Sequence, residues 1–169
     1  SEMVKRIKSG TDLQRCVSLT FDDGYQDFYT NAFPLLSSYG FHATLFVVSQ
    51  YIGRTMKTAQ GQEFPMTNEK QLGEMQESRY VDVMSHTSTH PRLSECSFEK
   101  AVEEVNVGRK DIESITGTQA SLFAYPFGIY TNEIVAHLHT ESRWDGAVTV
   151  EPGLVTHNSD TMLLKRNSI

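Results

Sequence analysis

The sequence predicts an α/β fold with parallel strands and outer helices, most simply a distorted, incomplete (β/α) barrel. Short apolar segments alternate along the chain with segments of helical periodicity, and a β-α-β-α order favours a parallel sheet. The chain has 169 residues, whereas a complete eight-fold barrel takes about 250. An open doubly wound sheet is the alternative, although no glycine-rich nucleotide loop follows any strand.

Five short segments have the composition of buried strands. The second of them is a nearly continuous apolar run, which is typical of a strand that is buried on both faces. The first alternates apolar and hydroxyl side chains. The five segments are Cys16–Phe21, Ala43–Ser49, Val81–Ser85, Leu122–Tyr125 and Ala147–Val150.

Four helices are expected between these strands. Apolar residues from Phe28 to Tyr39 recur at three- and four-residue steps, and Gly40 is placed to end that helix. Pro34 fits if the helix begins near Thr30 or Asn31, because first-turn amides lack intrahelical acceptors. Thr67 is expected to cap a helix from Asn68 to about Glu77. Ser97 is expected to cap a helix that ends at Gly117. Thr131 is expected to cap a last helix that includes Ile134, Val135 and Leu138. The segment from Gly53 to Pro65 lacks periodicity and is expected to be an exposed loop.

Composition limits the classes of function. The net charge is −6 and the Lys and Arg residues are scattered, so a nucleic acid or an anionic membrane is not expected as a partner. No window resembles a transmembrane span, and the hydrophobic content of 38% is that of a soluble globular chain. Cys16 and Cys96 do not make a disulfide framework. We expect one domain over residues 1–169. The sequence shows no signal peptide, which says little about export.

Two polar segments follow predicted strands. They are Thr20-Phe21-Asp22-Asp23-Gly24 and His86-Thr87-Ser88-Thr89-His90. One Asp and two His residues are a plausible ligand set for a catalytic zinc, with a second Asp left over as a base. Parallel strands gather catalytic groups at their carboxyl ends, where both segments lie.

Each segment also has a simpler interpretation. Asp-Asp-Gly is a common turn, and His86 and His90 could be two incidental histidines of a capped turn. Paired carboxylates at the end of an apolar strand are costly, however, unless a cation or hydrogen bonds compensate them. Taken together, the two segments indicate a hydrolytic metal site.

The two segments resemble the first two motifs of the NodB-homology polysaccharide deacetylases, carbohydrate esterase family 4. Phe123-Ala124-Tyr125-Pro126-Phe127-Gly128 resembles the third motif. The form of this third motif is nearest the branch that includes the poly-N-acetylglucosamine deacetylases. The resemblance runs from about Cys16 to Arg166. It implies an incomplete (β/α) barrel and metal-dependent hydrolysis of an acetyl group on a polysaccharide.

The resemblance also implies roles for individual residues. Asp23, His86 and His90 would bind the divalent metal, which we expect to be zinc, and Asp22 would be the general base. A backbone amide between Tyr125 and Phe127 would stabilise the oxyanion.

Four residues are expected to contact substrate. Tyr25 would lie at the pocket rim, Tyr125 could stack on a sugar ring, and Pro126 and Phe127 complete the predicted set. Trp144 could also stack on a sugar, although core packing suits both it and Tyr125 equally well.

Two departures from the family pattern affect catalysis. The family commonly places an Arg, which holds the base, at the position of Ala124, so Asp22 needs other partners to keep its pKa low. Arg166 lies where related sequences often carry an arginine. The family's acid His has no clear copy, and His157 is the nearest candidate, although a solvated loop His is commoner. Without an acid, Asp22 could return its proton to the leaving nitrogen.

Three functions follow. The first is a hydrolase, a secreted or cell-surface zinc N-deacetylase of an N-acetylglucosamine polymer such as poly-N-acetylglucosamine, peptidoglycan or chitin oligomers. The second is a catalytically impaired, metal-bearing carbohydrate-binding domain. The third is the same metal chemistry on a non-sugar amide. We expect a monomer with a polysaccharide substrate.

Overall fold

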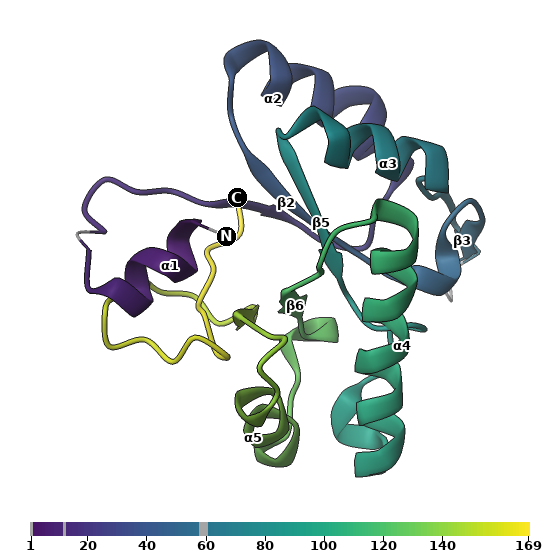
Figure 1. Cartoon of the computed structure of the whole chain (residues 1–169). Helices are drawn as coiled ribbons and strands as arrows, with labels where there is room; N and C mark the ends of the chain where they lie inside the picture. Colours follow the sequence, from purple (N-terminus) through teal and green to yellow (C-terminus); the bar gives the residue numbers. More distant parts are fainter. Residues whose placement is uncertain (1, 12, 58–60) are drawn as a thin grey trace.

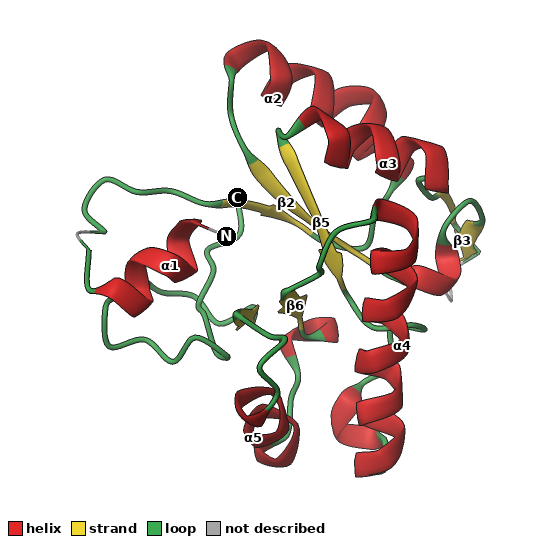
Figure 2. Ribbon diagram, in the orientation of Figure 1, coloured by secondary structure: helices red, strands yellow, loops and turns green. Residues whose placement is uncertain are grey.

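Five parallel strands form the main sheet of the protein. The computed structural model describes residues 2–11, 13–57 and 61–169. The strands lie in the order β1-β2-β5-β6-β7 and curl into a half-barrel with helices around it (Figure 1 and Figure 2), which confirms the predicted incomplete α/β barrel. Their bounds are β1 (Leu19–Phe21), β2 (Ala43–Val47), β5 (Val81–Ser85), β6 (Leu122–Ala124) and β7 (Gly146–Val148).

The remaining elements surround this sheet. The α-helices are α1 (Glu2–Ser9), α2 (Phe33–Tyr39), α3 (Glu69–Ser78), α4 (Phe98–Thr116) and α5 (Asn132–Thr140). A π-helix, η1 (Phe28–Ala32), leads into α2, and 3₁₀ turns form η2 (Ser49–Tyr51), η3 (Leu93–Glu95) and η4 (Pro126–Gly128). An antiparallel hairpin joins β3 (Thr55–Lys57) and β4 (Glu63–Pro65). Within the described residues, no helix is long and apolar enough to cross a membrane.

The core lies between the sheet and its helices. All five residues of β2 are buried, as expected for the central run of a sheet that is covered on both faces. One apolar cluster gathers β2 and β5 with α2 and α3, and a second gathers β6 with α4 and α5. These two clusters hold the carboxyl ends of the strands in fixed relative positions.

Most of the predicted helix ends are confirmed. The Ser97 side chain accepts a hydrogen bond from the Lys100 amide, and the Thr131 side chain accepts one from the Ile134 amide. Gly40 and Gly117 end α2 and α4 in the left-handed conformation that glycine adopts without strain.

The predicted cap of α3 was wrong by one residue. Asn68 caps this helix through a capping box with Gln71. Thr67 is fully buried instead, and its hydroxyl donates to the carbonyl of Gly24. The tertiary hydrogen bond to the first motif therefore removes Thr67 from the capping position.

Three other expectations needed correction. The first strand is shorter than predicted, because only Leu19–Phe21 pairs with β2. The segment expected as a loop contains the β3–β4 hairpin, apart from residues 58–60, which lie outside the described residues. Helix α1 was not predicted; its apolar side is formed by Val4 and Ile7, which are buried.

The C-terminal segment runs alongside β7. The Ala147 amide donates to Thr161, the Leu164 amide donates to Ala147, and the Thr149 amide donates to Leu164. Val148 and Leu164 form a parallel bridge. This segment brings Arg166 to the carboxyl end of β1, where it contacts Thr20 and Asp22.

Candidate functional site

The first two sequence motifs meet at the carboxyl ends of neighbouring strands. Asp22 and Asp23 directly follow β1, and His86 directly follows β5, with β2 between the two strands. Asp23 has a positive φ of 69°, and the amide of Gly24 donates to the carbonyl of Asp22. This tight turn ends β1 and points the two carboxylates of the motif toward different partners.

Asp23, His86 and His90 form a compact group of ligand atoms. The Asp23 Oδ1 atom lies 3.5 Å from the Nε2 atoms of both His86 and His90, and the two Nε2 atoms are 3.2 Å apart. Two nitrogen ligands at tetrahedral zinc distances would lie about 3.3 Å apart. The residues therefore fit a small divalent metal of the zinc type.

The orientation of His86 is fixed by the third motif. Its Nδ1 atom donates to the carbonyl oxygen of Ala124 at 2.7 Å, and the side chain is only 2% exposed. This hydrogen bond places the proton on Nδ1 and leaves the Nε2 lone pair directed at the triad. The residue at the position of the missing Arg therefore contributes its backbone to the site.

His90 is held in its neutral form. Its pKa is lowered to about 4, first by burial and then by the neighbouring His86, and the carboxylates of Asp23 and Asp22 oppose this shift only in part. A neutral imidazole is the form that can bind a metal. His90 thus has the protonation that a metal ligand needs.

Asp22 is paired with Arg166 rather than with the triad. The guanidinium makes two hydrogen bonds of 2.7 Å, one to each carboxylate oxygen. Burial raises the pKa of Asp22, but the Arg166 hydrogen bonds and the charges of His86, Arg166 and His90 outweigh burial, so the pKa lies below its usual value. Arg166 supplies the charge partner that Ala124 lacks.

The function of Arg166 was not predicted, although a signal for it existed. A partly buried carboxylate without the family arginine needs another cation, and few Arg residues follow the third motif. The separation of 144 residues between Asp22 and Arg166 hides this pairing from any local pattern.

Aromatic side chains border the triad. The Phe127 ring lies 4.6 Å from the ring of His90, is 48% exposed, and has the Arg92 guanidinium 4.5 Å above it. Tyr25 packs against Phe64 of β4 at 5.5 Å. Burial, followed by the charge of Asp23 and a hydrogen bond to it, raises the pKa of Tyr25 to about 12. Tyr25 therefore stays protonated beside the triad.

The other aromatic candidates lie in the core. Tyr125 has no exposed surface, and its hydroxyl donates to the carbonyl of Met162, so the predicted stacking of its ring on a sugar is wrong. Trp144 is 4% exposed and packs edge-on against Phe123. Pro126 is buried as well, so of the predicted third-motif set only the Phe127 side chain has a substantially exposed surface.

The structure does not bring His157 to the triad. His157 is exposed in a turn that is closed by hydrogen bonds between Thr156 and Ser159. Asp160, which follows, pairs with His139 at the end of α5, and the yellow loop that carries this turn extends toward α1 in Figure 1. Among the described residues no contact joins His157 to the triad, and its role as general acid stays a prediction.

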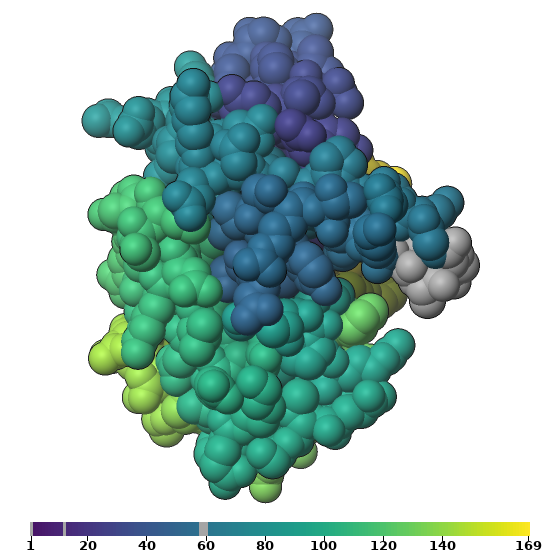
Figure 3. All heavy atoms as spheres, turned by 90° about the vertical axis from the view of Figure 1, so that its right-hand side faces the viewer, coloured from purple at the N-terminus to yellow at the C-terminus, as the bar shows by residue number. Residues whose placement is uncertain are grey.

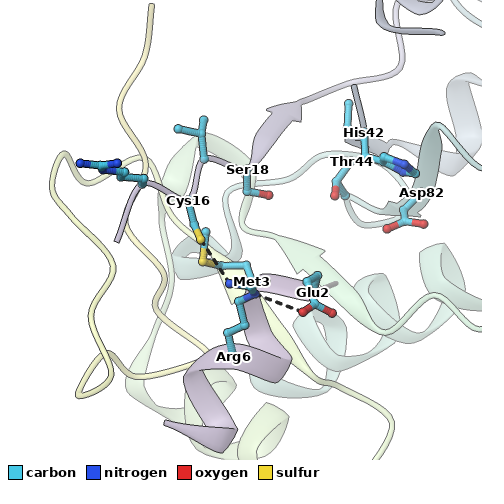
Figure 4. Close-up of a pocket in the computed structure, with 11 residues that line it drawn as sticks. Glu2, Met3, Arg6, Cys16, Ser18, His42, Thr44 and Asp82 are labelled. Carbon is cyan, nitrogen blue, oxygen red and sulfur yellow. Dashed lines mark hydrogen bonds and ion pairs between the residues drawn. The ribbon is translucent and has the colours of Figure 1, made fainter. Parts of the chain in front are cut away.

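A separate cavity lies at the opposite ends of the strands. It has a volume of about 420 Å³ and is lined by residues of α1 and of the amino ends of β1, β2 and β5, including Arg6, Cys16, Thr44 and Asp82. Figure 4 shows Arg6 in contact with Glu2 and Cys16 at this cavity. None of the triad residues lines it.

Comparison with known proteins places this chain in a family. The family model described as polysaccharide deacetylase matches residues 9–140. The chain belongs to the polysaccharide deacetylase family. Its three motifs, its half-barrel and the Asp-His-His group all lie within a fold shared with relatives of this family.

Two relatives and one solved structure illustrate the similarity of this deacetylase-family chain. It is 28% identical to the poly-beta-1,6-N-acetyl-D-glucosamine N-deacetylase of Staphylococcus epidermidis, over 98% of this chain and 58% of that protein. It is 30% identical to the peptidoglycan-N-acetylmuramic acid deacetylase PdaC of Bacillus subtilis, over 78% of this chain and 26% of that protein. The structure of Streptococcus pyogenes deacetylase PplD in complex with acetate shares the fold, with a TM-score of 0.84, 24% identity, and coverage of 98% of this chain and 70% of that one. The chain thus spans little more than half of the staphylococcal enzyme.

Proposed function

We propose that residues 1–169 form one NodB-homology domain that hydrolyses N-acetyl groups of a polysaccharide containing N-acetylglucosamine. The observation that carries the proposal is a compact Asp23-His86-His90 group with a second, ionised carboxylate beside it. The relatives named above act on poly-N-acetylglucosamine and peptidoglycan, and this substrate class supports a secreted or cell-surface location. We also propose that the domain acts as a monomer.

Asp23, His86 and His90 would hold the metal. Zinc bound there would polarise the acetyl carbonyl and lower the pKa of a water molecule. The hydrogen bond from His86 to Ala124 keeps one ligand in the required tautomer. The protein thus supplies three oriented ligands and leaves further coordination positions to water and substrate.

Asp22 would carry the proton. Arg166 holds both carboxylate oxygens, and each oxygen keeps a lone pair that can accept a proton from the attacking water. The water oxygen bonds to the acyl carbon, the carbon–nitrogen bond then breaks, and the proton on Asp22 passes to the leaving nitrogen. The products are the free amine and acetic acid, which releases the second water proton to solvent and becomes acetate. Because its pKa is low, protonated Asp22 is a strong enough acid for this second step.

The Phe127 amide would stabilise the developing oxyanion. In this turn the Tyr125 amide donates to Val148, the Gly128 amide donates to Tyr125, and Pro126 has no N–H. Among the described residues, the Phe127 amide is the one in η4 for which no acceptor is found inside the turn. Its left-handed backbone (φ 58°) places it at the exposed end of the motif, where it can donate to the oxyanion.

An acetate-release assay tests the proposal. Zinc-loaded protein should release acetate from N-acetylglucosamine oligomers, and Asp22→Asn should lower kcat by about 100- to 10,000-fold, the usual contribution of a general base. The zinc content of the variant should be unchanged, because Asp22 is not a ligand. Asp27→Asn, an exposed acid five residues away, is the matched control and should keep full activity.

The same assay separates the alternative function. A metal-bearing carbohydrate-binding domain would bind the oligomer equally well before and after the Asp22→Asn substitution and would release no acetate in either case. That result would contradict the deacetylase proposal. Release of acetate from a non-sugar amide, with none from the oligomer, would instead support the third function.

A further inference from the structure

The second-motif loop is strained and needs support from outside. Thr87 and His90 both have positive φ angles, 67° and 61°, in a region that side chains with a Cβ rarely adopt, β-branched ones least of all. Backbone hydrogen bonds from Ser49 to Thr87 and from Gln50 to Ser88 tie one side of the loop to η2. They do not reach the half of the loop that carries His90.

Inside that half the His90 amide donates to the Thr87 hydroxyl at 3.0 Å. From outside the loop, a side chain of α4 supports it. The Glu104 carboxylate accepts the Thr89 amide at 2.8 Å with one oxygen and the Thr89 hydroxyl at 2.9 Å with the other. The Glu104 carbonyl accepts the Ser88 amide at 3.1 Å. Thr89 immediately precedes His90, so these bonds act on the backbone that sets the position of the His90 ring.

The same side of α4 is shaped to receive the loop. Gly108, one turn after Glu104, lies so close to the loop that a Cβ there would be 2.4 Å from the Thr87 carbonyl carbon. Asp111, seven residues after Glu104, accepts a hydrogen bond from Ser49 of η2 at 2.5 Å. Figure 3 shows the blue segment around η2 lying against the green α4. Residues 104, 108 and 111 share one helix face. Glu104 and Gly108 face the second-motif loop, and Asp111 faces η2, which is hydrogen-bonded to that loop.

Burial of Glu104 is difficult to explain by helix stability alone. The residue is 1% exposed, and a buried carboxylate is costly unless it is fully hydrogen-bonded. Among the described residues, its one cationic contact is Lys100, at 3.3 Å from Oε1, on a side chain that is half exposed. An apolar residue would suit this helix position better if the loop did not need two hydrogen-bond acceptors.

We propose that Glu104 is a positioning residue for the metal site, which fixes His90 relative to Asp23 and His86 through Thr89. The inference rests on the proposed function, because it assigns Glu104 to the same metal group. It predicts that loss of the Glu104 acceptors weakens metal binding, since residues behind the ligands commonly change metal affinity by about 10- to 100-fold.

Metal affinity, rather than acetate release, provides the test. Zinc affinity is measured by chelator competition on the full chain, and visible absorption of the Co²⁺-loaded protein reports the ligand geometry. Glu104→Ala should weaken zinc binding about 10- to 100-fold and alter the Co²⁺ bands. Glu104→Gln should recover affinity to within about threefold, since its amide oxygen can accept the Thr89 amide while its NH₂ donates to the Thr89 hydroxyl.

Glu103→Ala is the matched control. Glu103 also contacts Lys100, at 3.1 Å, but its side chain is exposed. The two hydrogen bonds from Thr89 to a carboxylate go to Glu104, so the Glu103→Ala variant should bind zinc like the wild type. If Glu104→Ala does not fold, Thr89→Val removes one of the same hydrogen bonds and should weaken zinc binding by at least about threefold.

Two results would overturn the inference. The first is wild-type zinc affinity with unchanged Co²⁺ bands in the folded Glu104→Ala variant. If that variant does not fold, the same result in Thr89→Val counts instead. The second is a wild type that binds neither metal, which would also contradict the metal site itself. A wild type that binds zinc but releases no acetate would contradict only the proposed activity and leaves the test of Glu104 intact.

Discussion

Arg166 and Asp22 form the closest ion pair of the site. The guanidinium contacts both carboxylate oxygens at 2.7 Å and also donates to the Thr20 hydroxyl and the Thr149 carbonyl. A two-point Arg–carboxylate pair fixes orientation as well as charge. The pair therefore keeps Asp22 ionised and leaves its remaining lone pairs for the substrate side.

Loss of Arg166 should change the pH dependence of the reaction. Burial alone raises the pKa of Asp22, and the hydrogen bonds and charge of Arg166 are among the causes that bring it below its usual value. In Arg166→Gln the pKa should rise, so the base becomes protonated at a higher pH. The acidic limb of kcat/KM against pH should move upward, while zinc content stays unchanged.

The matched control for this profile is Arg92→Gln. Arg92 lies over Phe127 at the edge of the site but is not among the groups that shift the pKa of Asp22. Its acidic limb should stay at the wild-type position. An Arg166→Gln profile that coincided with the wild type would show that Arg166 does not set the ionisation of the base.

Single residues differed in how far the sequence could place them. Asp23, His86 and His90 were identifiable because each lies within a short motif directly after a predicted strand. Tyr125 was misjudged because burial of an aromatic ring depends on what packs over it, here the second apolar cluster and Met162. Glu104 carries no local signal, since an acid on a helix usually faces solvent.

Elements were predictable where local chemistry decides them. Ser97, Thr131 and Gly117 mark helix ends by capping hydrogen bonds and by backbone conformation, both of which are local. The β3–β4 hairpin is exposed and has no burial pattern, so hydrophobic periodicity could not reveal it. Thr67 was misassigned because a buried hydrogen bond to the first motif competed with capping.

Helix α1 offers a test of an element far from the triad. Lys8 pairs with Asp145 at 3.0 Å, just before β7, and this hydrogen bond is the main cause that lowers the pKa of Asp145. Both side chains are about half exposed, so Lys8→Met should cost about 0.5 kcal/mol of unfolding free energy at pH 7. Because folding lowers the pKa of Asp145, the ion pair stabilises the fold at pH values above the pKa that Asp145 has in the unfolded chain. This contribution should disappear as the pH falls through the pKa of Asp145 in the folded protein.

Urea unfolding at pH 7 and at acidic pH measures this contribution. Lys5→Met, an exposed lysine on the same helix, is the control and should leave stability unchanged within about 0.5 kcal/mol at both pH values. Val4→Ala should cost more, about 2 kcal/mol and independently of pH, because Val4 is buried against the sheet. A Lys8→Met effect that persisted equally at acidic pH would argue against the ion pair.

At the scale of the whole molecule, the two edge strands of the half-barrel do not pair with each other within the described part of the chain. β1 lies at one edge, and β7 with the C-terminal segment lies at the other. Arg166 connects them, since it donates to Thr149 just beyond β7 and to Thr20 and Asp22 of the β1 end. The contact with Arg166 therefore links the base Asp22 to the opposite edge of the half-barrel. The two residues are 144 positions apart, so local sequence patterns do not reveal this contact.

A double-mutant cycle on Asp22→Asn and Arg166→Gln should detect this connection as stability. Both side chains are largely buried, so the coupling free energy in metal-free protein at pH 7 should be about 1 to 3 kcal/mol by urea unfolding. The exposed pair Lys57–Glu63 is the control cycle, with an expected coupling of about 0.5 kcal/mol or less. Folding lowers the pKa of Asp22. The coupling free energy should therefore be complete at pH values above the pKa of Asp22 in the unfolded chain, and it should decline as the pH falls through the pKa of Asp22 in the folded protein. A coupling near zero at pH 7 would mean that the two edges are held by β7 and the core alone, and that Arg166 serves only the chemistry of Asp22.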